Sequence, residues 1–334
     1  MNDRKSLQTT KSNAVFNSLI NGRPYIILAA LSILFTIMAP DFINPVNILN
    51  LIKRQSYIAV AAFAATFVIT LGGLDLSVGS ISSLVGVSFA LLLSKSFLAT
   101  MPLWIALPVG VIIALLIGAA AGFINGFISV KGRITPFLVT LATMNIFRSI
   151  AIVLASSKEI TITNSEFATI FATGKLFGTI PTPVIILIIT FAISWYLFER
   201  TKYGYYVKAI GGNEEAATVS GINAGKIKIW TYTINGLFAA LAGLMLAGLY
   251  TSGSPSTGTD LALDSIAGVI LGGTAISGGT GKIWGTLAGI LIIAVIINGM
   301  TMLGAMYDIQ ILVKGIVIIL AVLLDNAINS RKRN

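Results

Sequence analysis

The chain has 334 residues, of which 56% are apolar and only 10% are charged. A soluble domain carries about 25% charged residues, so this composition is typical of a membrane protein. The absence of cysteine and histidine excludes disulfides, thiolate metal sites and thiol or imidazole catalysis. The net charge of +10 is better explained in a polytopic protein by cytoplasmic loops beside anionic lipid than by nucleic-acid binding.

Ten apolar segments follow a polar start. They lie near residues 24–40, 57–71, 78–94, 103–128, 134–155, 181–198, 229–250, 263–277, 283–304 and 309–324. Because a membrane-spanning helix uses about 20 residues, the sequence predicts an all-α polytopic membrane protein with about ten transmembrane helices. We expect residues 24–325 to form one transmembrane domain. Residues 1–23, which lack a cleavable signal pattern, and residues 326–334 are expected to be cytoplasmic tails.

The distribution of Lys and Arg predicts the orientation. With the N-terminus inside, the tails and the loops near 131–133, 199–228 and 280–282 hold 15 of them, the outer loops hold five, and two lie within spans. This excess favours cytoplasmic termini. Lys53 and Arg54 count against it, although an amphipathic segment 44–56 in the interface would lessen the conflict.

Two patterns recur five predicted spans apart. The stretch from Asp75 to Ser82 aligns with Asp260 to Ala267, and Ile124-Asn125-Gly126 is echoed by Ile297-Asn298-Gly299. An odd offset inverts the second copy, as in many transporters. The sequence therefore predicts two inverted five-helix repeats, with chance similarity between apolar stretches as the alternative.

Polar residues within the apolar segments are candidates for a solute path. Gly72-Gly73-Leu74-Asp75 interrupts an apolar run, and a carboxylate at the centre of a spanning helix costs roughly 2.5–3.5 kcal/mol. A helix break at that depth requires surrounding protein or a water-filled cavity. The translocation-path or helix-break candidates are Gly73, Asp75, Ser77, Ser80, Asn125, Asp264 and Asn298. Asp75 could equally cap the following helix, and the asparagines, including Asn235, could be interhelical hydrogen-bonding groups.

A source of energy for transport is not visible in the sequence. The stretch from Gly278 to Ile283 lacks both the earlier glycine and the Ser or Thr that a P-loop requires. We interpret it as a tight turn between packed helices. Catalytic residues, metal ligands and cofactors are not predicted.

The longest predicted cytoplasmic loop, 199–228, contains a short helix bounded by glycines. Its alanines would allow close approach to a partner, and a solvated connector is the alternative. The candidate coupling residues are Asn213, Glu214, Glu215, Ala216, Ala217 and Gly221.

Glu215-Ala216-Ala217-x-x-x-Gly221 resembles the EAA-type coupling motif of ABC-importer membrane subunits. Four further motifs make residues 24–325 similar to the permease subunit of ribose-type monosaccharide ABC importers. These motifs are the stretches from Gly73 to Ser80, Val130 to Ile134, Gly211 to Glu214 and Leu271 to Gly281. The outer stretch 156–180 shows no signature of that family.

The resemblance implies a multi-pass permease of the bacterial inner membrane that pairs as a dimer and is not an enzyme. It also implies two partners, a cytoplasmic ATP-binding subunit and a periplasmic or lipoprotein sugar-binding protein. The expected solute is ribose or a similar monosaccharide, and a hexose, a furanose signalling molecule or a nucleoside stays open. An ion-coupled secondary carrier using Asp75 is the rival from another class. An integral membrane enzyme would need a constellation of catalytic groups that the sequence lacks.

Overall fold

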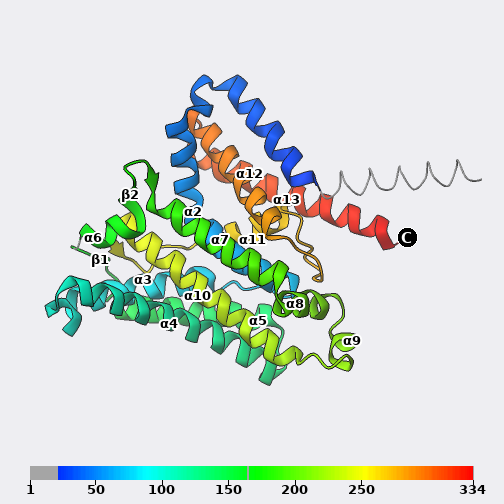
Figure 1. Ribbon diagram of the computed structural model, residues 1–334, viewed down its shortest axis with the longest axis horizontal. Helices are drawn as coiled ribbons and strands as arrows, with labels where there is room; N and C mark the ends of the chain where they lie inside the picture. The colour runs from blue at the N-terminus through cyan, green and yellow to red at the C-terminus, as the bar shows by residue number, and fades with distance from the viewer. Residues whose placement is uncertain (1–21, 164, 334) are drawn as a thin grey trace, which may run out of the picture.

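The computed structural model describes residues 22–163 and 165–333 as a bundle of helices (Figure 1). Within these ranges, seven helices are long and apolar enough to cross a membrane. They are α2 (Pro45–Thr70), α3 (Val78–Lys95), α4 (Leu103–Gly132), α5 (Pro136–Leu154), α7 (Thr182–Arg200), α10 (Ala224–Tyr250) and α12 (Ile283–Met302). The predicted all-α polytopic membrane protein is therefore confirmed.

Three more helices coincide with the remaining predicted segments. They are the apolar helix Gly22–Met38, α11 (Leu261–Leu271) and the C-terminal α13 (Tyr307–Arg333). The helix Gly22–Met38 includes the last two residues of the predicted N-terminal tail, whose other residues, 1–21, lie outside the described ranges. Helix α13 continues through most of the predicted C-terminal tail.

Short elements lie at the two ends of the bundle. Figure 1 shows α8 (Lys202–Gly212) and α9 (Glu214–Val219) at one end, which we call the α8–α9 end. At the opposite end lie α6 (Ser165–Ala168), β1 (Ile160–Thr161) and β2 (Lys175–Leu176). Strand β1 pairs antiparallel with β4 (Ser252–Gly253), and β2 pairs antiparallel with β3 (Ile180–Pro181). The remaining elements are η1 (Pro40–Ile43), η2 (Phe97–Thr100) and the π-helical η3 (Thr169–Thr173).

Helix α2 is longer than the sequence predicts. Asn44 caps it by accepting a hydrogen bond from the Val46 N–H at 3.0 Å, and the helix continues for 26 residues. The predicted interfacial segment 44–56 and the predicted span 57–71 are thus one helix. Lys53 and Arg54 interrupt the apolar run in the sequence without interrupting the helix.

Helix α11 is shorter than its predicted segment. It has 11 residues, which at about 1.5 Å each cover roughly half of a 30 Å hydrocarbon core. The helix ends early because Gly273 adopts a φ of +86°, a left-handed conformation that glycine allows. The following glycine-rich stretch turns back toward α12, in agreement with the predicted turn.

Glycines allow the central helices to approach closely. A Cβ on Gly122 of α4 would overlap the Tyr232 carbonyl oxygen of α10, and one on Gly236 of α10 would overlap the Gly118 carbonyl oxygen. In the same way, Gly272, directly after α11, lies against Gly285 of α12. Contacts between small residues replace the hydrophobic driving force that is weak between helices in lipid, and they hold the polar residues described next at fixed positions.

Candidate functional site

The connection between α2 and α3 breaks the apolar run inside the bundle. Gly72, at a φ of +86°, ends α2, and the Gly73 N–H donates to the Val68 carbonyl at 3.0 Å. This bond satisfies one of the carbonyls at the end of the helix. A Cβ on Gly73 would overlap the Tyr232 hydroxyl, so the glycine lets this ring of α10 pack directly against the break.

Asp75 is buried within this break, with 3% of its surface exposed. Its Oδ1 accepts hydrogen bonds from the Ser77 N–H at 2.8 Å and the Ser77 hydroxyl at 2.6 Å. Its Oδ2 accepts one from Asn235 Nδ2 of α10 at 2.9 Å. One carboxylate therefore fixes the turn that precedes α3 and also joins that turn to α10.

The hydrogen bonds continue from Ser77 into two further helices. Asn125 of α4 donates from Nδ2 to the Ser77 hydroxyl at 2.8 Å, and Thr143 of α5 donates to Asn125 Oδ1 at 2.7 Å. We call Asp75, Ser77, Asn125, Thr143 and Asn235 the buried polar network. It ties the helix break to α4, α5 and α10, and all five residues are buried.

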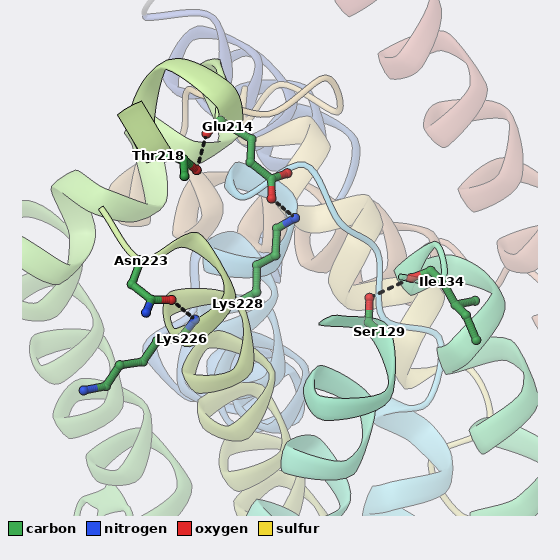
Figure 2. Close-up of polar contacts among 7 residues, drawn as sticks. All are labelled: Ser129, Ile134, Glu214, Thr218, Asn223, Lys226 and Lys228. Carbon is green, nitrogen blue, oxygen red and sulfur yellow. Dashed lines mark hydrogen bonds and ion pairs between the residues drawn. The ribbon is translucent and has the colours of Figure 1, made fainter. Parts of the chain in front are cut away.

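A cavity of about 920 Å³ opens at the α8–α9 end. Its inner wall includes Gly72, Gly73 and Tyr232, next to the buried polar network. Residues of α4, α9, α10 and the connections after α4 and α9 form most of the remaining lining, including Ser129, Arg133, Ile134, Glu214, Thr218 and Lys228. Figure 2 shows Lys228 pointing toward Glu214, with Ser129 and Ile134 at a separate part of the rim.

Helix α9 is a capped helix at the mouth of this cavity. Asn213 accepts a hydrogen bond from the Ala216 N–H at 2.9 Å, and two glutamates occupy the first turn, where the helix dipole favours negative charge. Gly221, at a φ of +87°, follows its last turn. Ala217 is buried and the other five predicted coupling residues are exposed, so the helix presents a free face.

Helix α8 anchors α9 to the bundle. The Tyr203 hydroxyl lies 2.7 Å from the Thr231 hydroxyl of α10, and burial raises the pKa of the Tyr203 phenol. Lys208 forms an ion pair with Glu199 of α7 at 2.8 Å. On the other side of α9, Lys228 of α10 forms an ion pair with Glu214 at 2.6 Å.

The remaining predicted path residues do not form one site. Ser80 is buried in α3, where its hydroxyl donates to the Ser77 carbonyl at 2.8 Å. Asp264 of α11 forms an ion pair with Lys314 of α13 at 2.7 Å. Asn298 of α12 exchanges two hydrogen bonds with Asn47 of α2, at 2.9 and 3.0 Å. The structure thus gathers Gly73, Asp75, Ser77, Ser80 and Asn125 and leaves Asp264 and Asn298 in separate interhelical contacts.

Comparison with known proteins identifies the family. The family described as branched-chain amino acid transport system / permease component matches residues 47–322.

The chain belongs to this permease family.

Curated relatives match nearly the full length of the permease. It is 41% identical over 327 residues to the ribose import permease of Bacillus subtilis, which covers 96% of this chain and 98% of the relative. It is 39% identical over 317 residues to the Haemophilus influenzae ribose import permease, with 94% and 95% covered. The L-arabinose transport system permease of Escherichia coli is 34% identical over 336 residues, with 98% and 99% covered. No solved structure shows a significant match.

These relatives confirm the predicted resemblance to ribose-type ABC permeases. The chain is a multi-pass membrane permease of this family, and the relatives named for ribose import are permease subunits and not enzymes. Within residues 22–163 and 165–333, no group of three metal-ligating side chains lies together.

Sequence reasoning missed two members of the site. Thr143 completes the buried polar network, and Thr140 accepts a hydrogen bond from the Leu76 N–H in the break at 3.2 Å. Both lie on one face of α5, three residues apart. That spacing in an apolar helix is the only signal they carry in the sequence.

Proposed function

We propose that the permease imports ribose or a similar monosaccharide, driven by ATP hydrolysis on a separate subunit that docks on α9. The observation that carries this proposal is the combination of an exposed, capped helix with a cavity behind it. Helix α9 carries the residues that resemble the EAA motif, and the cavity extends from it to Gly72 and Gly73. The relatives named for ribose import support the choice of sugar.

The same proposal includes a sugar-binding protein on the opposite side of the membrane and a second permease subunit. In this arrangement the binding protein selects the solute, and the permease alternates access to a path between its halves. The buried polar network lies at the inner end of the cavity. Because its five residues are buried and Asp75 joins the turn before α3 to α10, we assign the network to holding the helix break in place.

We further propose ten spans in two inverted five-helix repeats, with the α8–α9 end and both termini in the cytoplasm. Helices α3 and α11, which contain most of the two aligned stretches 75–82 and 260–267, support the inversion. Helices α3 and α11 begin close together, since a Cβ on Gly79 would overlap the Gly258 carbonyl oxygen. Helix α11 then ends beside the start of α12 at the α8–α9 end, whereas α3 continues toward η2 at the other end. The excess of Lys and Arg predicted for the cytoplasmic loops supports the orientation.

Transport can be tested in proteoliposomes that contain the permease, its ATP-binding subunit and its sugar-binding protein. Uptake of labelled ribose should require hydrolysable ATP on the α8–α9 side and should be unaffected by proton or sodium ionophores. Labelled arabinose provides the comparison sugar. Loss of uptake on adding an ionophore, with ATP held constant, would overturn the proposal in favour of a secondary carrier.

The orientation can be tested with single cysteines, since the chain contains none. Thr218 of α9 and Lys175 of β2 are both exposed and lie at opposite ends of the bundle. Thr218→Cys should react with an impermeant thiol reagent only from the cytoplasm, and Lys175→Cys only from outside. Reaction of both from one side would contradict the proposed arrangement of spans.

A further inference from the structure

Three segments meet backbone against backbone at the last turn of α8, just before α9. The first is the end of α2 at Thr70 and Gly72, the second is Gly211 in the last turn of α8, and the third is the turn between α11 and α12 at Gly278 and Gly279. We call these five residues the glycine junction. The Gly279 N–H donates a hydrogen bond to the Thr70 carbonyl at 2.8 Å, so the turn is bonded to the end of α2.

Gly211 lies at the centre of the glycine junction. A Cβ at this position would overlap the Thr70 carbonyl oxygen and would lie 2.7 Å from the Gly279 nitrogen. From the other side, a Cβ on Gly278 would lie 2.8 Å from the Gly211 carbonyl oxygen and 3.1 Å from the Gly72 Cα. No side chain separates the three segments, and tightly packed backbone cannot yield by changing rotamer as a side chain can.

The position of the glycine junction links α9 to both halves of the permease. Gly211 precedes the α9 cap, Asn213, by two residues. Gly72 begins the break that contains Asp75, and Gly279 precedes the start of α12 by four residues. A displacement of α9 that is passed along the chain through Asn213 and Gly212 therefore reaches α2 and the α11–α12 turn together, at Gly211.

We propose that the glycine junction transmits the movement of α9 to the helix break and to the turn before α12. Gly211 is then a positioning residue that couples ATP hydrolysis to transport. This inference rests on the proposed function. It assigns to α8, which is not itself part of the candidate docking helix, the role of rigid connection between the ATP-binding subunit and the two halves.

The test compares alanine at two adjacent glycines of α8. Gly211→Ala would force the segments of the glycine junction apart. Gly212→Ala is the matched control, because nothing lies within 4 Å of its added methyl group. Both variants would be purified in complex with the ATP-binding subunit, and ATP hydrolysis and labelled ribose uptake would be measured on the same preparation.

We expect Gly211→Ala to retain the ATP-binding subunit and to hydrolyse ATP, since α9 is unchanged. Its uptake per ATP hydrolysed should fall about fivefold or more, which corresponds to the lower end of typical coupling free energies between sites. Gly212→Ala should keep the wild-type ratio. An assembled Gly211→Ala complex with an unchanged ratio would overturn the inference, whereas a wild type without ATP-dependent uptake would overturn the proposed function itself.

A second variant covers the case in which Gly211→Ala does not assemble. A Cβ on Gly281, in the same turn, would overlap the Thr70 hydroxyl, which is buried and has no hydrogen-bond partner among the described residues. Gly281→Ala should lower uptake per ATP, and adding Thr70→Ala should restore it by removing that hydroxyl. A wild-type ratio in assembled Gly281→Ala, or the lack of rescue by Thr70→Ala, would contradict transmission through the glycine junction.

Discussion

Asp75 and Asn235 are 160 positions apart in the sequence, yet Oδ2 of the carboxylate and Nδ2 of the amide lie 2.9 Å apart inside the bundle. The other carboxylate oxygen accepts two hydrogen bonds from Ser77. Asn235 Oδ1 is buried and has no hydrogen-bond partner among the described residues. Substitutions at position 75 can therefore test the negative charge of Asp75 separately from its shape and its hydrogen bonds.

Asparagine and leucine at position 75 should have different effects. In Asp75→Asn the amide oxygen can still accept from Ser77, and the new NH₂ group can donate to Asn235 Oδ1 once that amide turns over. We expect a loss of at most about 1 kcal/mol and partial retention of ATP-dependent uptake. Asp75→Leu leaves buried donors of Ser77 and Asn235 without an acceptor, at about 1–3 kcal/mol each, and should lose most uptake.

The measurements are the thermal midpoint of the purified permease and the uptake of labelled ribose. A fully inactive Asp75→Asn with an unchanged midpoint would show that the negative charge itself is required. That result would favour the ion-coupled carrier, because a neutral amide cannot cycle a proton or balance a cation.

Local signals in the sequence predicted most of the helices, including a short helix at α9 that closes at Gly221; the cap at Asn213 was found only in the structure. Apolar run length places a helix in lipid regardless of its neighbours. Asn213 and Gly221 mark the start and end of α9 through side-chain and backbone preferences that are local as well. The length of α2 was underestimated because Lys53 and Arg54 lower hydropathy without carrying any signal that ends a helix.

The partners of the polar residues could not be predicted in the same way. Asn125 and Asn298 look equivalent in the sequence, but Asn125 belongs to the buried polar network and Asn298 pairs with Asn47. These partners depend on which helices lie side by side, and that depends on the packing of small residues throughout the bundle. Thr143 went unnoticed because threonine is common in apolar helices and usually bonds to its own backbone.

The reciprocal pair of Asn47 and Asn298 should stabilise the contact between α2 and α12. Each single alanine substitution leaves the partner amide without two hydrogen bonds, whereas the double substitution removes both amides. The double-mutant cycle should therefore give a coupling free energy of about 0.5–1.5 kcal/mol. Asn145→Ala is the control, because Asn145 is exposed and bonds only within its own helix. Additive effects of Asn47→Ala and Asn298→Ala would show that the pair contributes nothing.

The ion pair of Asp264 and Lys314 should matter more than the one at the cavity mouth. The side chains of Asp264 and Lys314 are 13% and 20% exposed, whereas that of Glu214 is 53% exposed. Lys314→Met leaves a mostly buried carboxylate without its hydrogen-bonding partner and should cost about 1–3 kcal/mol, with much of it recovered when Asp264→Asn is added. Lys228→Met should cost less than about 1 kcal/mol. Equal thermal midpoints for Lys314→Met and Lys228→Met would contradict this ranking.

A charge placed at Gly221 should weaken the hold of α9 on the ATP-binding subunit. Gly221 has a φ of +87° and nothing within 4 Å of an added Cβ. In the isolated permease, Gly221→Asp should therefore cost only about 1 kcal/mol of backbone strain, and the protein should insert and purify normally. In the complex the carboxylate would lie at a close contact without a partner, where the loss of binding free energy is roughly 2–5 kcal/mol.

Gly304, between α12 and α13, provides a matched control for this substitution. It has a φ of +76° and also has nothing within 4 Å of an added Cβ, but it follows α12 at the end of the bundle away from α9. Gly304→Asp should thus carry the same strain and the same charge without touching the docking helix. The measurement is co-purification of the ATP-binding subunit with each variant, together with ribose uptake. Gly221→Asp should lose the subunit while Gly304→Asp retains it, and equal retention by both would mean that α9 is only a connector between α8 and α10.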